Sequence, residues 1–586
     1  MHLTCNFKLD YHTVSNLKYM SKKYYFFIIL TFTFFNINTV WSQSLPVGTA
    51  GIEDYYRRKQ LLGDLDSSVS FSFRPIHPTA AFKINNIFKP DSISNSGTKF
   101  KFVDPVHFLG KLGVVKVLPL TWLQQVNSHH PYGWNDGAMI PSKGYQTMIS
   151  GGFFAKLGPL SIQLRPEFVY AQNKYFEGFY TSNRSNAELT GYYGFYNLMD
   201  NPERFGTGTY SKANWGQSSI RLTFDPISVG LSNENLWWGP GVKNAIMMTN
   251  NASGFKHLTL NTTRPIRTGI GSFEAQIVAG KLENSGLTPL EQTNNISGQN
   301  LFNAYNNDWR YLSGFNISYQ PKWVPGFFLG FMRDFMAYND DIKGFKDYFP
   351  FFFPVQKATT GSQGDPFARD QRISMYARWL FPKAHAEIYF EYGINDNAYN
   401  YRDFIGSPDH ARAYIFGITK LIPLKYKKEE FIQINAEVDQ LSQSPDRLVR
   451  PAGGFYQHFQ VRQGYTNLGQ VLGAGTGSGG NLQSFDISWV KALNKLGIAF
   501  ERYEHNADFY DAAITDLNGH SRRWVDFAIS SQGQWAYQNF ILNAKLQVIK
   551  SLNYQWDMKN YSTDLYYVPK NDVFNFHGEV GISFRF

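Results

Sequence analysis

Hydrophobic and polar side chains alternate along most of the chain with a period of two residues. In the clearest case, 431–440 (FIQINAEVDQ), isoleucine, alanine and valine alternate with amides and acids. Successive side chains of a β-strand point to opposite faces, so such a segment has one apolar and one polar face. The same alternation recurs in 162–168, 385–392 and 542–548. The pattern predicts amphipathic strands from about residue 67 onward.

A soluble sandwich and a membrane barrel both alternate in this way, but a sandwich turns its apolar faces inward and a barrel turns them toward lipid. The polar faces carry charges at several successive positions, as the hydrated lumen of a barrel allows. The segments also recur along the whole chain. At about ten residues per strand, the residues after position 42 accommodate roughly 16 to 20 strands. We therefore expect an all-β fold, a transmembrane antiparallel β-barrel.

The composition agrees with this class of protein. The 586-residue chain is 17% aromatic and 17% charged, whereas soluble domains average about 25% charged residues. Its mean hydropathy of −0.34 is too low for a bundle of membrane helices. A single cysteine argues against a disulfide scaffold or a zinc protein. We expect neither a metal nor a cofactor.

The first 42 residues predict an exported protein. Lys22 and Lys23 precede an apolar run, Tyr24–Phe35, which is shorter than the roughly 20 residues that a membrane-spanning helix needs. A basic start, a short apolar region and a cleavage site before Gln43 are typical of a signal peptide. A start at Met20 would make the preceding residues an extension.

The net charge and the position of the single cysteine limit which partners and modifications we expect. The formal net charge is +10, and residues 1–42 hold four lysines and one aspartate, which leaves +7 for the rest. Without a dense run of Lys or Arg, nucleic acid is a poor candidate, and anionic polysaccharide or lipid head groups fit better. Cys5 precedes the apolar run. The acceptor cysteine of a lipoprotein follows that run, so we expect no lipidation at Cys5.

One helix is predicted near the start of the exported chain. Between Pro46 and Gly63, apolar and aromatic residues recur every three or four positions, and Glu53 and Asp54 lie in the first turn. We divide the chain into an extension and signal peptide (1–42), a small N-terminal helical periplasmic plug (43–66), and the barrel with its extracellular loops (67–586).

The last strand resembles a barrel-insertion signal. Residues 576–586 have one apolar face, and the sequence ends on an aromatic residue. Barrel-assembly machinery reads terminal strands of this type. We expect the signal to comprise Phe576, Val580, Ile582, Phe584 and Phe586.

Several motifs carry a resemblance to a known family. They are NENLWWGPG (233–241), NNASGF (250–255), GIEDYYRRKQLLG (51–63), LRPEFVY (164–170), PDHARAY (408–414), QVRQGYTNLGQ (460–470) and ERYEHNADFY (501–510). With them the chain resembles the Wzi family of capsule-assembly outer-membrane proteins, from about residue 46 onward. The resemblance implies a barrel of about 18 strands, closed by helical elements on the periplasmic side and by extracellular loops at the other end. It also implies a surface lectin that helps to assemble or anchor capsular polysaccharide.

Sugar recognition needs aromatic faces for stacking and amides, carboxylates or arginines for the hydroxyl groups. We expect glycan binding at Asn233, Glu234, Asn235, Trp237, Trp238, Asp409, His410, Arg412, Arg462 and Tyr465. An alternative stays open for the two tryptophans, which would otherwise lie in the aromatic girdle or plug the lumen. Glu234, with Arg165 and Glu167, would then belong to an ion-pair network that braces the barrel.

No catalytic motif stands out. Neither a Gly-x-Ser-x-Gly elbow nor a His-Glu-x-x-His motif occurs. Glu387 and Glu391 share a strand face and could mimic a glycosidase pair, but two lumen carboxylates on one strand are more often structural. His505 with Asp508 invites an acid–base interpretation. We expect a binding protein and not an enzyme, with a barrel enzyme as an open alternative.

Other functions stay open as well. An outer-membrane channel or porin, or a partner of a secretion or surface-motility machine, would fit the same barrel. The aromatic stretch YFPFFFP (348–354) indicates either a loop at the membrane interface or a sugar-stacking platform. The expected partners are capsular or exopolysaccharide, outer-membrane lipid and the barrel-assembly machinery. We expect a monomeric barrel in a Gram-negative outer membrane, reached through the general secretion pathway.

Overall fold

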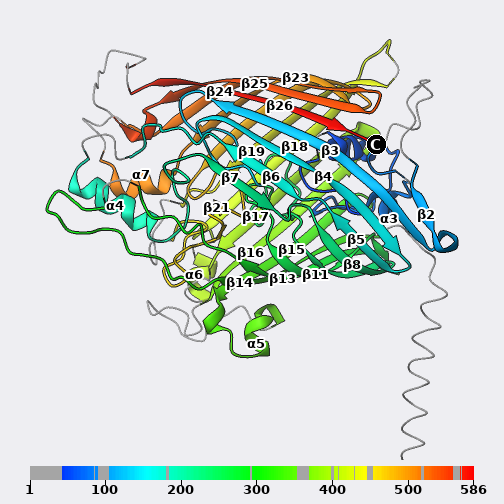
Figure 1. Ribbon diagram of the computed structural model, residues 1–586, viewed down its shortest axis with the longest axis horizontal. Helices are drawn as coiled ribbons and strands as arrows, with labels where there is room; N and C mark the ends of the chain where they lie inside the picture. Colours follow the sequence, from blue (N-terminus) through cyan, green and yellow to red (C-terminus); the bar gives the residue numbers. More distant parts are fainter. Residues whose placement is uncertain are drawn as a thin grey trace, which may run out of the picture.

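The chain forms a closed antiparallel β-barrel with segments folded into its lumen (Figure 1). The computed structural model describes residues 43–49, 51–84, 86–89, 104–179, 184–290, 293–352, 369–396, 401–406, 408–427, 429–444, 453–515, 521–557, 568 and 571–586. The predicted signal peptide lies outside these residues. Among the residues described, no helix is both long and apolar enough to cross a membrane.

The barrel wall consists of strands that pair with their neighbours along the chain. They are β2 (Val106–Phe108), β3 (Gly113–Asn127), β4 (Gly144–Leu157), β5 (Leu160–Leu164), β6 (Glu167–Ala171), β7 (Tyr210–Asn214), β8 (Ser219–Phe224), β9 (Ile227–Ser232), β11 (Lys256–Thr262), β12 (Ile266–Arg267), β13 (Gly271–Leu282), β14 (Arg310–Pro321), β15 (Phe327–Tyr338), β16 (Asp370–Phe381), β17 (Ala386–Asn395), β18 (Arg412–Pro423), β19 (Glu430–Gln440), β22 (Asn481–Lys491), β23 (Asn494–Glu504), β24 (Val525–Tyr537), β25 (Phe540–Leu552) and β26 (Val573–Phe584).

The wall contains the number of strands that the family resemblance implies. Strands β5 and β6 occupy one position, because β4 pairs with both, and β7 and β8 together occupy the next. The short β2 and β12 only extend the pairing of β3 and β13. Counted in this way, the described part of the chain forms a closed wall of 18 strands, which confirms the predicted fold.

The last strand closes the barrel. β26 pairs with β25 on one side and with β3 on the other, from His577 opposite Asn127 to Phe584 opposite Leu120. The predicted alternation is present: Phe576 is 41% exposed on the outer face, whereas His577 is fully buried on the inner face. The assignment of this strand as an insertion signal stays a prediction.

The apolar faces of the strands point outward, as in a membrane barrel. On β17, Glu387 and Glu391 are fully buried in the lumen, while Phe390 between them is 43% exposed. On β19, Gln433 and Glu437 are likewise buried on the inner side. A soluble sandwich buries the opposite face. The outer wall therefore offers lipid an apolar surface.

The two ends of the barrel differ in the length of their connections. Outer-membrane barrels have short periplasmic turns and longer extracellular loops, which makes the end at the left of Figure 1 extracellular. This end carries α4 (Asn186–Tyr196), η3 (Asn339–Asp341), α5 (Phe345–Tyr348), η4 (Pro350–Phe352), α6 (Tyr401–Gly406), α7 (Ala507–Ala513) and η6 (Tyr554–Trp556). The C-terminus, η1 (Leu109–Lys111) and η5 (Pro382–Ala384) lie at the periplasmic end.

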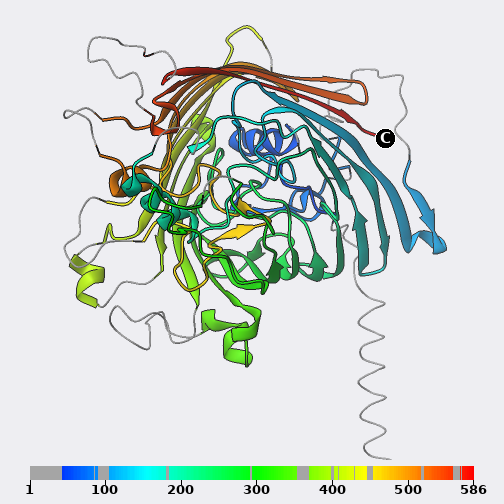
Figure 2. The ribbon, with the colours of Figure 1, turned by 60° about the vertical axis from the view of Figure 1, so that its left-hand side comes forward.

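The N-terminal segment folds inside the barrel (Figure 2). The predicted helix is α2 (Ile52–Leu61), with acids in its first turn and basic residues in its last turn. It is followed by β1 (Phe73–Arg74), which pairs with β10 (Trp237–Trp238), and by α3 (Pro78–Phe82). A second short pair, β20 (Thr466–Asn467) with β21 (Gln470–Val471), comes from the loop after β19.

The plug is longer than the sequence predicts. The first described strand of the wall begins at Val106, and the described residues between 67 and 89, which we assigned to the barrel, lie with α2. The two residues of β1 do form a strand, but they pair with β10 rather than with the wall. We use the word plug below for the described residues from 43 to 89.

Buried charges hold the plug against the wall. The Arg57 Nε atom of α2 lies 2.6 Å from an Oε of Glu387 on β17, and Arg378 on β16 lies 2.6 Å from the other carboxylate oxygen. Arg378 also donates to the side chain of Gln60 on α2, at 2.9 Å. Glu387 thus neutralises one guanidinium from the plug and one from the wall.

We expect Glu387→Ala to lower the free energy of unfolding by about 3–5 kcal/mol, because it leaves two buried guanidinium groups without their counter-ion. Urea unfolding of the barrel in lipid vesicles measures this change. Asp64→Ala, which breaks the exposed Lys59–Asp64 pair, is the control and should cost less than about 1 kcal/mol. Equal losses in the two variants would show that Glu387 does not secure the plug.

Candidate functional site

The NENLWWGPG motif folds down into the lumen instead of forming an exposed surface. Trp237 and Trp238 make up β10 and are 4% and 0% exposed. The indole of Trp238 donates to the Gln276 side chain at 2.7 Å, and the guanidinium of Arg74 lies 4.2 Å from the ring centre of Trp237. Both rings therefore fill space between the plug and the wall.

The polar residues of this motif are also occupied by internal partners. Glu234 is fully buried, lies 2.9 Å from Arg221 and accepts a hydrogen bond from Ser44. Burial alone raises the pKa of Glu234, but Arg221 and Ser44 outweigh it and bring the pKa below its usual value. The side chain of Asn235 donates to the Ala252 carbonyl at 2.7 Å. Both side chains are buried and bonded within the barrel, so neither is exposed to a sugar.

The structure thus contradicts the predicted glycan surface at this motif. Glu234, Asn235 and the Trp238 indole are hydrogen-bonded inside the barrel, and Arg74 lies over the buried Trp237 ring. A polysaccharide cannot stack on a ring that has no exposed face. The residues corrected in this way are the buried Glu234, Asn235, Trp237, Trp238 and Tyr465; the ring of Tyr465 lies 3.6 Å from the Arg372 guanidinium. Asn233 is half-buried and donates to the Gly216 carbonyl at 3.1 Å, and its role stays a prediction. The open alternative, tryptophans that plug the lumen, is what the structure shows.

The predicted network around Arg165 and Glu167 is made mainly of hydrogen bonds. Arg165 donates to the Thr121 hydroxyl at 3.1 Å, and Glu167 accepts from the Gln217 amide at 3.0 Å. Gln217 also donates to Asn235 at 3.0 Å, which connects this part of the wall to the buried motif. The group braces the lumen, as the structural alternative predicts.

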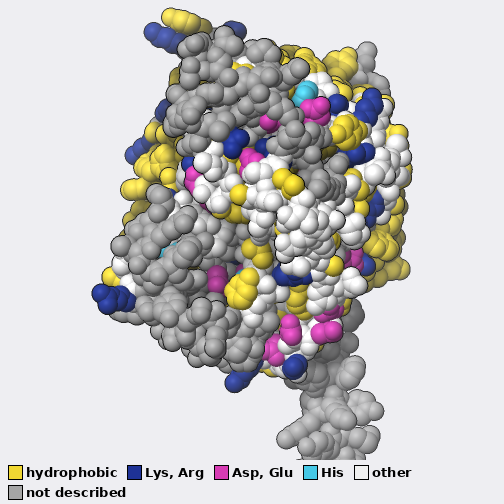
Figure 3. Space-filling view, turned by 90° about the vertical axis from the view of Figure 1, so that its left-hand side faces the viewer, with side chains coloured by type: hydrophobic (Ala, Val, Ile, Leu, Met, Phe, Trp, Pro, Cys, Tyr) yellow, Lys and Arg dark blue, Asp and Glu magenta, His cyan; other side chains and the backbone are white. Residues whose placement is uncertain are grey.

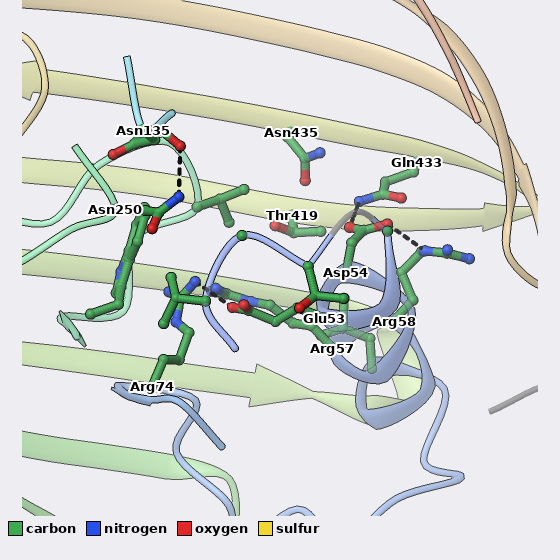
Figure 4. A pocket seen from close by; sticks show the side chains of 17 residues that line it. Glu53, Asp54, Arg57, Arg58, Arg74, Asn135, Asn250, Thr419, Gln433 and Asn435 are labelled. Carbon is green, nitrogen blue, oxygen red and sulfur yellow. Dashed lines mark hydrogen bonds and ion pairs between the residues drawn. The ribbon is translucent and has the colours of Figure 1, made fainter. Parts of the chain in front are cut away.

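Space remains between the plug and the wall (Figure 4). A cavity of about 270 Å³ is lined by charged residues of α2 and by polar residues of β18 and β19. Asp54 accepts from Gln433 at 3.0 Å and lies 2.9 Å from Arg58. Burial opposes ionisation of Asp54, but Arg58, Lys495 and Gln433 lower its pKa to about 2. The cavity holds paired charges and has room for about nine waters at about 30 Å³ each.

A larger cavity lies at the extracellular end. Its volume is about 660 Å³, and it opens between α7 and the extracellular ends of β18, β19, β22 and β23. Every lining residue but one is polar or charged. They are Arg412, Gln440, Ser442, Gln443, Ser444, Asn481, Glu504, Ala507, Asp508, Asp511 and Arg523. We call this cavity the polar pocket.

Arg523 organises the polar pocket. Its two terminal nitrogens lie 2.9 Å from Glu504 and 2.5 Å from Asp511. In the same pocket, Arg412 donates to the Ser442 carbonyl at 3.0 Å. The carboxylate of Asp508 accepts from the backbone N–H of Gln443 at 2.7 Å. Carboxylates, amides and guanidinium groups of this kind hydrogen-bond the hydroxyl groups of sugars. Among the described residues, no cluster of three His, Cys, Asp or Glu side chains could hold a metal ion.

A ladder of aromatic rings lies beside the polar pocket. The rings of Phe179, Tyr192, Tyr196 and Tyr305 follow one another nearly face to face, with centres 4.5, 5.8 and 6.4 Å apart. Tyr192 and Tyr196 are half-buried on α4, where they line a small cavity with Glu203 and Arg204. We call these four rings the aromatic ladder.

Helix α7 joins the ladder to the polar pocket. Its Phe509 packs edge-on against Phe179 at 5.4 Å, and the flanking Asp508 and Asp511 face the pocket. Asn506 begins α7 by accepting from the Phe509 amide, and Ser185 begins α4 through a capping box with Glu188. In Figure 3, the described part of this face shows charged side chains of both signs among polar groups and backbone, with hydrophobic side chains along the flanks.

Only one predicted glycan-binding residue, Arg412, lines the polar pocket. Asp409 and His410 are half-buried just before it in the chain, and the half-buried Arg462 donates to the Ala304 carbonyl. His505 does not act as an exposed base: its ring stacks on Trp524 at 3.5 Å and bonds to Asp526 at 2.7 Å. No sugar-binding role was predicted for Glu504, Asp511, Arg523 or the α4 tyrosines. The only available signal was the density of charge in 501–511.

A family model described as capsule assembly protein Wzi matches residues 130–559. A solved Escherichia coli structure, described as Wzi, an outer-membrane protein involved in group 1 capsule assembly and a carbohydrate-binding β-barrel, is similar with a TM-score of 0.56 and 12% identity. That match covers 93% of this chain and 100% of the other. Acinetobacter baumannii OccAB1 (TM-score 0.37, 8% identity, 80% of this chain and 95% of that one) and Pseudomonas aeruginosa OprD (0.36, 6%, 83% and 98%) are more distant. No curated protein matches the sequence.

Asp508 should make the stability of α7 depend on pH. Burial, reinforced by Asp511 and opposed by Gln443 and Arg412, raises the pKa of Asp508 from 3.8 to about 7. The folded protein therefore holds a proton that the unfolded chain releases, so this contribution to stability is full below pH 3.8 and is lost as the pH rises to about 7.

We expect hydrogen-exchange protection of residues 506–513, corrected for intrinsic rates, to fall by up to tenfold per pH unit on approaching pH 7 (a limit of about 1.4 kcal/mol per unit). Asp508→Asn cannot ionise and should remove this slope. Asp511→Asn, at an exposed aspartate of the same helix, should keep most of it. An unchanged slope in Asp508→Asn would assign the effect to another group.

Proposed function

The chain belongs to the Wzi family of capsule-assembly proteins, as its motifs predicted, and on that premise we propose that it is an outer-membrane lectin. It binds capsular polysaccharide or exopolysaccharide at its extracellular face and so helps to assemble or anchor a capsule. The carbohydrate-binding character of the E. coli relative supports this proposal. The fold itself is an outer-membrane β-barrel.

One observation carries the proposal. The polar pocket and the aromatic ladder lie next to each other at the extracellular end, joined by α7. Together they offer hydrogen bonds to sugar hydroxyl groups and, on the half-buried Tyr192, Tyr196 and Tyr305, aromatic surface for apolar contact with sugar rings. Each sugar unit of the polysaccharide makes only weak contacts of this type. Several repeat units bound along the face would together retain the polymer.

The proposed function is binding without catalysis. Glu387 and Glu391, the carboxylates that could mimic a glycosidase pair, are fully buried within the lumen. Glu387 is paired with two arginines, and Glu391 accepts hydrogen bonds from Ser374 and from the Ile246 backbone at 3.0 and 3.2 Å. The structural partners of both acids account for their presence.

Export and insertion complete the proposal. A signal peptide within residues 1–42 directs the chain through the general secretion pathway, and the apolar face of β26 serves the barrel-assembly machinery as an insertion signal. The closed pairing of β26 with β3 supports a barrel formed by a single chain.

We expect Arg412→Gln to weaken binding of polysaccharide fragments by about tenfold to a hundredfold, because a hydrogen bond to a charged group contributes about 1.5–3 kcal/mol. Tyr196→Ala should weaken it by about twofold to tenfold, through the loss of stacking worth about 0.5–1.5 kcal/mol. Titration calorimetry of the purified barrel measures both affinities. The ratio of cell-bound to released polysaccharide measures the consequence in cells.

Matched controls lie at periplasmic turns. Arg267→Gln and Tyr426→Ala remove the same side chains at positions that are 73% and 91% exposed but far from the extracellular face. Both should bind like the wild type. If deletion of the gene leaves the amount and the attachment of polysaccharide unchanged, the lectin function is wrong.

The same barrel provides a test of the alternative function, a channel. The plug and the inward-folded loops fill the lumen, and the internal cavities of about 270 and 190 Å³ are lined by plug residues such as Val47 and Thr49. We therefore expect the wild-type protein to be silent in planar bilayers under conditions in which a porin conducts. Stable single-channel steps would favour transport over anchoring.

A further inference from the structure

The loop after β15 turns outward, over the outside of the barrel. Figures 1 and 2 both show α5 beyond the wall, next to the extracellular end of β14. The segment 233–255, in contrast, folds into the lumen. The described part of the outward loop contains η3, α5 and η4, and ends at Phe352 within the YFPFFFP stretch.

This loop packs on the lipid-facing side of the wall. The ring of Phe351 lies 5.3 Å from that of Phe315 on β14, and Phe315 lies 5.7 Å from Phe331 on β15. The ring of Tyr348 lies 5.4 Å from that of Tyr311, whose hydroxyl donates to the Tyr348 carbonyl at 3.0 Å. The β14 residues in these contacts alternate with inward-facing Arg310, Leu312 and Asn316, so the loop contacts the outer face.

The surface below the loop is the apolar belt of the barrel. Ile317, the next outward residue after Phe315 on β14, is 42% exposed, and Leu329 on β15 is 45% exposed. Side chains in these positions contact lipid in a membrane barrel. The loop therefore continues the lipid-contacting surface toward the extracellular rim.

Three aromatic side chains keep exposed surface although the loop packs on the wall. Phe345, Tyr348 and Phe352 are 67%, 46% and 66% exposed, whereas Phe351 between them is buried against β14. Asp347 holds the turn that presents them, because it accepts from the Gly344 and Lys343 amides at 3.0 and 3.1 Å. The loop lies on Phe315, next to the lipid-facing Ile317 and Leu329, which places the three rings at the edge of the membrane.

We propose that Phe345, Tyr348 and Phe352 form an aromatic wedge that inserts into the outer leaflet of the membrane beside β14 and β15. The occupant of this surface is lipid, at the boundary between acyl chains and head groups, where aromatic side chains of membrane proteins concentrate. The wedge fixes one side of the extracellular rim at the membrane surface. It uses no residue of the polar pocket or the aromatic ladder, so it is independent of the proposed lectin function.

The chain permits a direct test by spin labelling. Cys5 is the only cysteine, so a protein produced from Gln43 onward behind a foreign leader contains none. Single variants Phe345→Cys and Phe352→Cys carry a nitroxide in vesicles of phosphatidylethanolamine and phosphatidylglycerol. Power saturation compares collisions with oxygen, which concentrates in lipid, and with a water-soluble nickel chelate.

Two reference positions calibrate the measurement. Leu329→Cys places the label on the lipid-facing wall, and Asn303→Cys places it on an exposed polar loop of the extracellular end. We expect the labels at 345 and 352 to show an oxygen-to-nickel collision ratio several times that at 303 and close to that at 329. Both positions are exposed, and the heat-dependent gel mobility of the folded barrel verifies that each variant folds.

The other outcomes overturn the proposal. A ratio equal to that at Asn303 would place the rings in water. Low collision rates with both reagents, together with dipolar broadening between labels, would place them against a second copy of the chain. Either result would leave the lectin function untouched, because that function is tested at Arg412 and Tyr196.

Discussion

The requirement that no backbone polar group be left unpaired in lipid governs this structure. Hydrocarbon offers no hydrogen bonds, so a sheet that spans a membrane must close on itself. The pairing of β26 with β3, from His577 opposite Asn127 to Phe584 opposite Leu120, meets this requirement. Once the sheet is closed, every strand has one face toward lipid and one toward the lumen. The period-two alternation follows directly, and so do the buried Glu387 and the exposed Phe390 on the same strand.

A wall of 18 strands encloses more space than its own side chains can fill. The chain fills this space with two segments: the N-terminal plug, and the loop that contains Trp238. Arg57 of the plug meets Glu387 of the wall at 2.6 Å, and Arg74 covers the ring of Trp237. Ion pairs suit this interface because the lumen faces of the strands are already polar. The buried tryptophans therefore help to fill the lumen, although two tryptophans beside Asn and Glu residues look like a sugar site in the sequence.

This division also explains which features could be predicted from the sequence. Strand alternation is local, so the barrel and the helix α2 were predictable, and the family motifs added the strand number. Whether a loop folds into the lumen or stays at the surface depends on contacts with residues far away in the sequence. Trp237 and Tyr196 both lie in connections between strands of the wall, yet one is covered by Arg74 while the other is half-buried on α4. The strand β1 was assigned to the wall for a similar reason, because its pairing with β10 leaves no mark in its own two residues.

The extracellular end brings these constraints together. The barrel gives α4 and α7 a rigid base, since Phe509 packs beneath the aromatic ladder while its neighbours Asp508 and Asp511 face the polar pocket. A polymer held by many weak contacts gains from such rigidity, because little conformational entropy is lost when each contact forms. The loop carrying Phe345 and Phe352 packs instead on the outer wall at β14 and β15. Lipid contacts on the outside and sugar contacts on top can then act on the same rim without competing for residues.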